Sequence, residues 1–420
     1  MIYKNQETGT EYVDISSLPV FSNGRTRHVI SLFSGAGGLD IGLEQAGFST
    51  AVAVENDIDC RETLRFNRPE WKLFEKSTWE ENGVQKQREP GDIRMIDSSE
   101  ILELANLKKG QTDLVVGGAP CQPFSNIGKK QGKDDEKNGD LFLEFVRIVK
   151  GVQPRGFIFE NVAGITQGKH SEVLTYMYNQ FEGEGYSISY AILNAADYGV
   201  PQTRERFFLI GLKGSRKPAF PLPSHFRSKI LWEKFSRKLD QKPSYLPKNW
   251  VSVKKAFSKI PTNSNNRSDY ALMNVSQKVI DRMRLIKQDE NFKVLPMDMR
   301  PNCWKNGKHQ GQDTFGRLNE NQPSVTIRTA AYNPSKGKYI HPNENRGLST
   351  IEMAALQDFP KKWIFKCLKR EKITLVSGGR QIGNAVPPGL AKALAIALRH
   401  QIENTTKESQ KKHLEPSAMN

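Results

Sequence analysis

The sequence predicts an α/β fold, in which a doubly wound, mostly parallel sheet is joined to a second, smaller, loop-rich domain. Two observations carry this prediction. Between residues 28 and 212, short apolar runs typical of buried strands alternate with helical patterns. After Leu212 the alternation is lost, and prolines recur with the polar run TNSNNRSD at 262–269. The length of 420 residues fits two or three domains.

The first elements are a strand, a glycine turn and a helix. HVISLF (28–33) is rich in β-forming residues, SGAGG follows it, and LDIGLEQAG carries apolar residues on one helical face. TAVAV (50–54) predicts a second strand that ends at Glu55, with a helix from Asp59 to Phe66 behind it. Further strands are predicted at 113–118, 156–160, 188–193 and 206–211, and helices at 139–152, 171–181, 349–359 and 389–404.

These patterns divide the chain into five parts. The final stretch, TTKESQKKHLEPSAMN, is too polar to pack against a core, so we expect it to be disordered. The predicted parts are an N-terminal arm (1–27), a catalytic domain (28–212), a second domain (213–345), a return to the first domain (346–403) and a disordered tail (404–420).

The charge of the chain is concentrated in the second domain. The formal net charge is +16, and residues 213–320 contain 23 Lys and Arg against 9 Asp and Glu. Aromatic residues such as Trp232, Tyr245 and Trp304 alternate with these charges, as on a nucleic-acid-binding surface. The alternatives are an ordinary solvated basic surface or one that binds acidic lipid or RNA. Composition favours a polyanionic partner.

Several classes of protein are disfavoured. No apolar run is long enough to cross a bilayer, so we expect a soluble intracellular protein that binds no membrane. The four cysteines lie far apart, with no C-x-x-C pair and no histidine cluster at metal spacing. We therefore expect free thiols in a reducing compartment and no metal site.

The unusual polar groups follow the predicted strands. A glycine turn follows the first strand, Glu55 ends the second, Cys121 follows the third and Glu160 ends the fourth. Ligands bind at the carboxyl ends of strands in doubly wound sheets. Glycine backbone N–H groups and an acid that accepts ribose hydroxyls favour an adenosine-containing cofactor. FSGAGG is not G-x-G-x-x-G, so a simple tight turn is the alternative, and the spacing leaves the cofactor open.

Cys121 lies in GGAPCQPFSNIG, between Pro120 and Pro123 and before the polar run KKQGKDDEKNGD. A free cysteine is usually a small buried hydrophobe, but this stiff and polar setting favours a reactive thiol. A thiol needs an electropositive or acid–base-assisted site to act as a nucleophile. Arg204 and Arg206 in PQTRERF alternate along an extended segment and could supply one, although a plain surface strand gives the same pattern.

Eight segments in order resemble the DNA (cytosine-5) methyltransferases, from about Val29 to Leu398. The segments are SLFSGAGGLDIGLEQAGF, AVAVENDIDC, GDI (91–93), GGAPCQPFSNIGKKQG, FIFENVAGI, ADYGVPQTRERFFLIG, RLNENQPSVTI and QIGNAVPPGLAKAL. The resemblance implies a Rossmann-like, class I S-adenosylmethionine-dependent fold, with the basic segment as the target-recognition domain. The implied reaction is methyl transfer to carbon 5 of a cytosine that is flipped out of double-stranded DNA.

The resemblance also implies site residues. The implied catalytic residues are Cys121 as the nucleophile, Glu160 as the group that binds the target base, and Arg204 and Arg206 as its support. Gln122, Ser125, Asn161 and Gln202 are the implied substrate-binding residues, and closure of the segment 125–140 over the base is expected. The residues implied to bind S-adenosylmethionine, or its product S-adenosylhomocysteine, are Phe33, Ser34, Gly35, Ala36, Gly37, Gly38, Glu55, Asn56, Asp92, Ile93, Pro120, Asn384 and Ala385.

The sequence departs from the family pattern at four positions. Asn56 stands where an aromatic residue often stacks on adenine. In RGLSTIEMAALQDFP, Ile351, Ala355 and Asp358 stand at the usual Arg, Arg and Gly of R-x-L-T-x-R-E-x-A-R-L-Q-G-F-P. These changes affect the junction between the domains rather than the chemistry.

The resemblance is strongest to bacterial or phage modification enzymes. It predicts a cytoplasmic monomer that protects host DNA from a partner restriction endonuclease. Two alternatives stay open at this stage. One is cytosine methylation of RNA by the same chemistry, and the other is a DNA-binding relic without activity.

Overall fold

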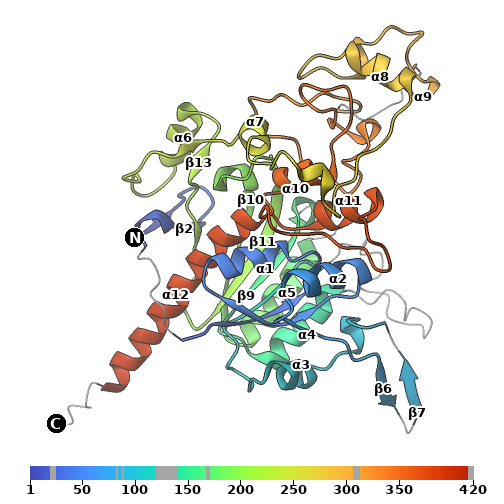
Figure 1. The fold of residues 1–420 in the computed structure, drawn as a ribbon. Helices are drawn as coiled ribbons and strands as arrows, with labels where there is room; N and C mark the ends of the chain where they lie inside the picture. Colours follow the sequence, from blue (N-terminus) through green and yellow to red (C-terminus); the bar gives the residue numbers. More distant parts are fainter. Residues whose placement is uncertain are drawn as a thin grey trace, which may run out of the picture.

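The computed structural model describes residues 1–18, 25–81, 84–87, 89–119, 141–166, 171–305 and 313–414. Its centre is a seven-stranded sheet with the order β10-β11-β9-β8-β3-β4-β5 (Figure 1). Neighbouring strands are parallel, except that β11 is antiparallel to both β9 and β10. The predicted mostly parallel sheet is confirmed. The strands are β3 (His28–Leu32), β4 (Ser49–Val54), β5 (Lys72–Leu73), β8 (Leu114–Gly117), β9 (Gly156–Val162), β10 (Tyr186–Asn194) and β11 (Glu205–Lys213).

Helices cover both faces of this sheet. Alternate residues of a strand point to opposite faces, so Val29 of β3 packs with α1 and α12 while Ile30 packs with α3 and α4. Both residues are completely buried, as expected for a parallel strand covered on each side. The helices of this layer are α1 (Gly38–Gln45), α2 (Ile58–Asn67), α3 (Ser98–Ala105), α4 (Leu141–Val152), α5 (Ser171–Gly183) and α12 (Pro388–Leu414).

The predicted disordered tail is wrong for residues 404–414. Helix α12 continues through them to Leu414 and extends beyond the body of the molecule (Figure 1). The reason is local: Glu, Lys and Gln are good helix formers, and no proline or glycine interrupts the helix before Pro416. Residues 415–420 lie outside the described part of the chain.

Part of the predicted N-terminal arm is an ordered strand pair. Strands β1 (Ile2–Lys4) and β2 (Glu11–Val13) form a three-stranded sheet with β12 (Phe220–Pro221). Tyr3 is 3% exposed and packs in one cluster with Leu222 and Trp232. The start of the chain therefore stabilises a segment more than 200 residues away.

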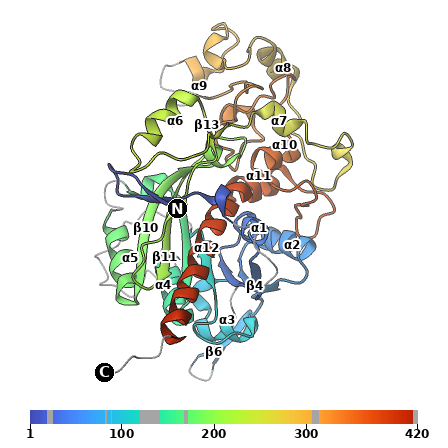
Figure 2. The ribbon, with the colours of Figure 1, turned by 90° about the vertical axis from the view of Figure 1, so that its left-hand side faces the viewer.

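The second domain contains two separate hydrophobic cores. The α6 lobe (residues 222–250) includes β13 (His225–Phe226), α6 (Lys229–Ser236) and β14 (Lys248–Asn249). The α8–α9 lobe (275–305 and 313–340) includes α8 (Gln277–Arg284) and α9 (Asn302–Lys305). Figure 2 shows α6 above β10, with α8 and α9 at the top of the molecule.

The aromatic residues of this basic segment form its cores. Trp232 is 2% exposed and its ring lies 5.7 Å from Phe235 and 5.6 Å from Tyr245. Trp304 is 7% exposed and packs in the α8–α9 lobe. The interpretation of these rings as part of a nucleic-acid surface is therefore wrong for Trp232 and Trp304, because a chain with many loops must use its large apolar side chains to make cores.

The chain returns to the first domain through α7 (Val253–Phe257), α10 (Thr350–Leu356) and α11 (Leu375–Asn384). These helices share a core with α1 and α2. The structure also contains a hairpin that the sequence did not indicate, with strands β6 (Thr78–Glu81) and β7 (Val84–Gln87). Among the described residues, no helix is both long and apolar enough to span a membrane.

Candidate active site

A cavity of about 560 Å³ lies at the carboxyl ends of β3, β4, β8 and β9. Its volume is in the range of small-molecule sites. The position is the one expected for a ligand site in a doubly wound sheet. The described lining residues are Ser31, Leu32, Phe33, Ser34, Gly35, Gly38, Leu39, Glu55, Asn56, Asp57, Cys60, Gly118, Ala119, Glu160, Asn161, Val162, Arg204, Arg206, Arg380, Gln381, Gly383, Asn384, Ala385 and Val386.

The glycine turn after β3 forms one wall. Phe33 has a positive φ of 54°, and Gly35 one of 55°, so the chain turns sharply out of the strand. A side chain at Gly38 would meet the carbonyl oxygen of Val386 at 2.2 Å. Glycine is required there because the backbone of the last motif packs directly on this turn. Ala36 and Gly37 belong to the same turn but lie outside the cavity lining.

Glu55 is held by two backbone bonds at the end of β4. The N–H of Gly35 donates to Oε2 at 2.6 Å, and the N–H of Asp57 donates to Oε1 at 2.7 Å. The side chain is buried, and burial raises its pKa despite these bonds. The carboxyl group is therefore fixed in orientation beside the glycine turn, as the sequence predicted. Asn56, which replaces an aromatic residue, also lines the cavity.

The GDI segment lies next to Glu55 but outside the cavity lining. A side chain at Gly91 would meet the carbonyl oxygen of Glu55 at 2.1 Å, so the two segments touch. Asp92 caps a short 3-10 helix, Ile93–Met95, and its carboxylate is bound by Arg94 at 2.6 Å and 2.9 Å. Ile93 is buried in the core of the sheet. The GDI segment therefore lies beside the site, but its side chains do not line the cavity.

Glu160 and Arg206 form an ion pair inside the cavity. Glu160 lies in β9 two residues before its end, Arg206 is the second residue of β11, and Arg206 Nε lies 3.0 Å from Glu160 Oε1. Burial raises the pKa of Glu160, although the attraction of Arg206 and Arg204 opposes this. A side chain at Gly118 would meet Glu160 Oε2 at 2.6 Å, so glycine leaves space for the carboxyl group. An acid with a raised pKa in a cavity is typical of a functional site.

Arg204 is a structural link as well as a cavity residue. It is 1% exposed, and its guanidinium donates to the carbonyl oxygens of Ile327 at 2.9 Å and Gly383 at 2.8 Å. Gln202 lies outside the cavity lining and is completely buried. Its amide bonds the backbone of Leu356 and Ile327. The geometry gives Gln202 a structural role, and its predicted contact with substrate has no support among these bonds.

Asn161 fixes the backbone at the end of β8. Its side-chain Nδ2 donates to the carbonyl oxygen of Ala119 at 3.2 Å, and its Oδ1 accepts from the N–H of Val162 at 2.7 Å. Residues 120–140 lie outside the described part of the chain. Four predicted site residues therefore remain untested by the geometry: Pro120, Cys121, Gln122 and Ser125.

Arg380 is a cavity residue that sequence reasoning missed. It lies on α11, and its Nη2 approaches Asp57 Oδ2 at 2.9 Å and Asp59 Oδ2 at 3.1 Å. It thereby ties the loop after Glu55 to the last motif, where Asn384 and Ala385 line the cavity as predicted. The sequence signal that could have indicated Arg380 is a charge match: two aspartates lie in ENDID, and an arginine directly precedes QIGNAVPP. Only the fold shows that these segments meet.

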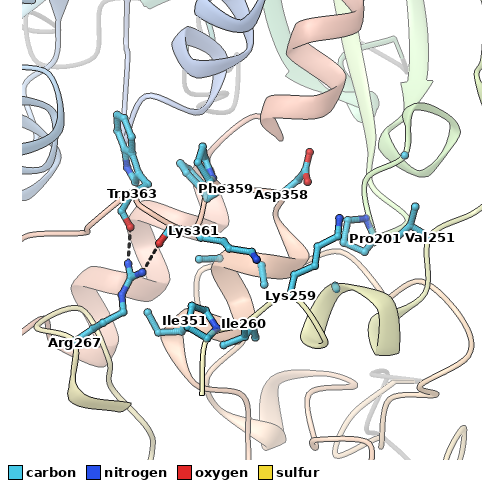
Figure 3. Close-up of a pocket in the computed structure, with 16 residues that line it drawn as sticks. Pro201, Val251, Lys259, Ile260, Arg267, Ile351, Asp358, Phe359, Lys361 and Trp363 are labelled. Carbon is cyan, nitrogen blue, oxygen red and sulfur yellow. Dashed lines mark hydrogen bonds between the residues drawn. The ribbon is translucent and has the colours of Figure 1, made fainter. Parts of the chain in front are cut away.

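The three residues that depart from the family pattern near the domain junction lie close together, outside the large cavity. A cavity of about 90 Å³ between α7 and α10 is lined by Ile351, Ala355 and Asp358 (Figure 3). Asp358 has a φ of 67°, which explains the usual glycine, and its carboxylate accepts from the N–H of Gly389 in the first turn of α12. These departures change the packing between domains and leave the lining of the large cavity unaltered.

The fold and the cavity define a class of protein. A doubly wound sheet with a glycine turn, an oriented acid after the second strand and a buried carboxyl–arginine pair is an α/β enzyme that can hold an adenosine-containing molecule beside a second substrate. The sequence model of the C-5 cytosine-specific DNA methylases matches residues 27–400, and the chain belongs to this family. It is a C-5 cytosine DNA methyltransferase of the restriction–modification type.

The relatives carry names that agree with this. The chain is 32% identical over 372 residues to the type II methyltransferase M1.HphI of Haemophilus parahaemolyticus, with 88% of this chain and 86% of the relative covered. It is 30% identical over 400 residues to the type II methyltransferase M.Sau96I of Staphylococcus aureus, with 93% and 79% covered.

Solved structures share the fold. A candidate DNA modification methyltransferase encoded within an E. coli prophage superposes with a TM-score of 0.60 at 25% identity, covering 90% of this chain and 100% of its own. The S. pombe Dnmt2 methyltransferase superposes with a TM-score of 0.57 at 16% identity, covering 90% and 99%. The second likeness concerns the fold alone.

Proposed function

We propose that this enzyme transfers a methyl group from S-adenosylmethionine to carbon 5 of a flipped-out cytosine in a specific sequence of double-stranded DNA, through a covalent bond to Cys121. The observation that carries the proposal is the single cavity that contains both Glu55 with the glycine turn and the Glu160–Arg206 pair. One wall is the end of β8, and Cys121 follows Ala119 by two residues. Chain connectivity keeps the two Cα atoms within about 8 Å.

The cavity fits S-adenosylmethionine. Glu55 is oriented to accept hydrogen bonds from ribose hydroxyls, and the glycine turn brings backbone close to the ligand. Arg380 lines this side of the cavity, where Asp57 and Asp59 hold its guanidinium in place. Asn384, which is exposed at the end of α11, could bind the amino-acid part. When bound, the cofactor supplies an electrophilic methyl group.

The residues of the chain then activate the cytosine. Carbon 5 is a weak nucleophile within an aromatic ring, and addition of the Cys121 thiolate at carbon 6 converts the ring to an enamine. Negative charge develops toward ring nitrogen 3, where protonated Glu160 donates a hydrogen bond, and Arg206 stabilises the carbonyl oxygen. Methylated carbon 5 then loses its proton, the sulfur–carbon bond breaks and the thiolate leaves.

This chemistry requires a base outside the helix. Extrusion of a stacked cytosine costs a few kcal/mol. We propose that the second domain holds the duplex while the base enters the cavity, and that residues 125–140 close over it. We also propose that the enzyme acts as a monomer and protects host DNA together with a partner endonuclease. The type II methyltransferase names of its relatives support the restriction–modification context.

Two experiments test the proposal. Bisulfite sequencing of DNA from cells that express the protein should show 5-methylcytosine at one recurring sequence, and RNA from the same cells should be unmodified. Methylation of RNA alone would contradict the assignment of the substrate.

The second experiment concerns the nucleophile. Cys121→Ser should bind duplex DNA and lose methylation. The native enzyme, given S-adenosylmethionine and a duplex with 5-fluorocytosine at the target, should form a covalent adduct at Cys121, because fluorine cannot leave as a proton does. Turnover by Cys121→Ser, or an adduct at another residue, would refute the mechanism.

A further inference from the structure

The α6 lobe carries an exposed positive surface that the catalytic site does not use. Residues 222–250 contain seven Lys or Arg and two Asp or Glu. All seven basic side chains are exposed. Within the described part of the chain, one of them forms an ion pair, Lys238 with Glu7 at 2.6 Å. The basic residues are Arg227, Lys229, Lys234, Arg237, Lys238, Lys242 and Lys248.

The lobe is attached at the active-site edge of the sheet. It docks on η5 (Ala195–Tyr198), the short helix that directly follows β10. Trp250 Nε1 donates to Asp197 Oδ1 at 2.8 Å, and the N–H of Ser224 donates to the carbonyl oxygen of Asp197 at 3.0 Å. Because β10 and β9 run in the same direction on either side of β11, η5 lies at the edge of the sheet where β9 ends, near Glu160.

The distance from the cavity suits a flanking segment of duplex. In the sheet, β10 and β9 are separated by β11, which corresponds to about 10 Å. One turn of B-DNA is about 34 Å long, so a duplex with its cytosine in the cavity passes over this edge within a turn. Figures 1 and 2 both show α6 above β10.

The chemistry of the lobe favours the sugar–phosphate backbone of a duplex. Its aromatic rings are used in its own core, as shown by Trp232 and its neighbours, so they are not available to stack unpaired bases. Exposed aliphatic side chains, Ile230 at 67% and Leu246 at 72%, accompany the lysines. Lysines without fixed ion-pair partners bind phosphates and carry no base specificity.

We propose that the α6 lobe binds the phosphates of double-stranded DNA that flanks the target site, while the other lobe of the second domain remains for base recognition. This inference rests on the proposed function, because it uses the same duplex. Lys229 and Lys234 on α6 are its central contacts. The lobe would add affinity for long DNA without changing the chemical step.

The test compares two double variants of the full-length enzyme with equal loss of charge. One is Lys229→Gln with Lys234→Gln. The matched control is Lys108→Gln with Lys109→Gln, at exposed positions before β8 and therefore at the opposite edge of the sheet. Fluorescence anisotropy measures binding to a 40-bp duplex and to single-stranded DNA of the same length as the salt concentration is varied.

On the 40-bp duplex, the α6 variant should lower the slope of log affinity against log salt by about 1.8, since each lost phosphate contact removes about 0.9. Affinity near 0.15 M salt should fall roughly tenfold or more. The control variant should keep the slope of the native enzyme, and kcat on saturating DNA should be unchanged for both variants.

Equal slopes for the two variants on the 40-bp duplex would overturn the inference. A loss of binding to single-stranded DNA as large as the loss on the long duplex would also overturn it. Failure of the proposed function would be seen in a different measurement, the methylation assay of the native enzyme. The salt slopes measure DNA binding alone, so they test the inference even if the native enzyme is inactive.

Discussion

At the scale of single residues, the site depends on how burial competes with charge. Glu160 has its pKa raised by burial, while Arg206, 3.0 Å away, pulls the pKa down. In the proposed mechanism, the protonated form of Glu160 donates to the target base. Arg206 therefore decides how far toward alkaline pH that form persists.

This gives a prediction for Arg206→Met. The rate should fall, since the carbonyl oxygen of the base loses a donor, by about 10²-fold. Without the positive charge the pKa of Glu160 rises, so the decline of kcat with rising pH should begin at a higher pH than in the native enzyme. The measurement is kcat against pH under saturating substrates. A kcat that rises with pH as Glu160 ionises would show that Glu160 acts as the carboxylate.

A second residue, Asp40 in α1, controls stability rather than catalysis. It is completely buried, Thr50 Oγ1 lies 3.2 Å from its Oδ1, and its Oδ2 has no hydrogen-bond partner among the described residues. Burial raises its pKa to about 7. In the unfolded chain an aspartate titrates near 3.9. Between these values the folded protein binds the extra proton, so its stability falls as pH rises.

Asp40→Asn removes this dependence. Comparing pH 5 with pH 7 by chemical denaturation, the native enzyme should lose on the order of 2 kcal/mol more of its unfolding free energy than the variant does. Asp197 and Asp358, whose pKa values are also raised to about 6, remain in both proteins and cancel in the comparison. Parallel pH curves would mean that Asp40 is ionised in the folded state.

At the scale of elements, the two arginines of the PQTRERF segment have different tasks. Arg204 joins the start of β11 to Ile327 and to Gly383 at the end of α11, whereas Arg206 faces Glu160. The alternating spacing predicted one shared side for both. Both do line the same cavity. Arg204 has the additional structural task because residues near Ile327 and the last motif pack against it.

Arg204→Met should therefore destabilise the protein by about 3 kcal/mol, since two buried carbonyl oxygens lose a charged donor. It should also weaken binding of S-adenosylhomocysteine, because Gly383 precedes Asn384 in the cavity. Thermal unfolding and calorimetric titration measure the two effects. Arg206→Met is the comparison variant: it leaves both carbonyl oxygens bonded and should bind S-adenosylhomocysteine like the native enzyme. Equal weakening of that binding by both variants would contradict the division of roles.

At the scale of the whole molecule, the N-terminal strand pair connects the two domains. Tyr3 contributes to the core of the α6 lobe, and Lys4 N donates to Asp240 Oδ1 at 2.9 Å. The lobe has few core residues of its own, so this contribution is a large share of its stability.

Tyr3→Ala should loosen the α6 lobe by about 3 kcal/mol and speed tryptic cleavage within 222–250. The catalytic domain should keep its thermal unfolding midpoint and its affinity for S-adenosylhomocysteine. The control is Tyr190→Ala, which changes a tyrosine on β10 that is 50% exposed. Unchanged cleavage in the Tyr3 variant would show that the lobe folds without the strand pair.

The sequence by itself predicted the mostly parallel sheet, the glycine turn, the acid after the second strand and the family to which the chain belongs. These depend on local patterns, since a buried strand and a tight turn each specify their own residues. Only the tertiary structure decided that Arg380 reaches Asp57 and Asp59, that Gln202 is buried against the backbone of Leu356 and Ile327, and that aromatic residues of the basic segment form cores. Those outcomes depend on contacts between residues far apart in the chain, which no local pattern records, and on the need of a loop-rich domain to bury its largest side chains.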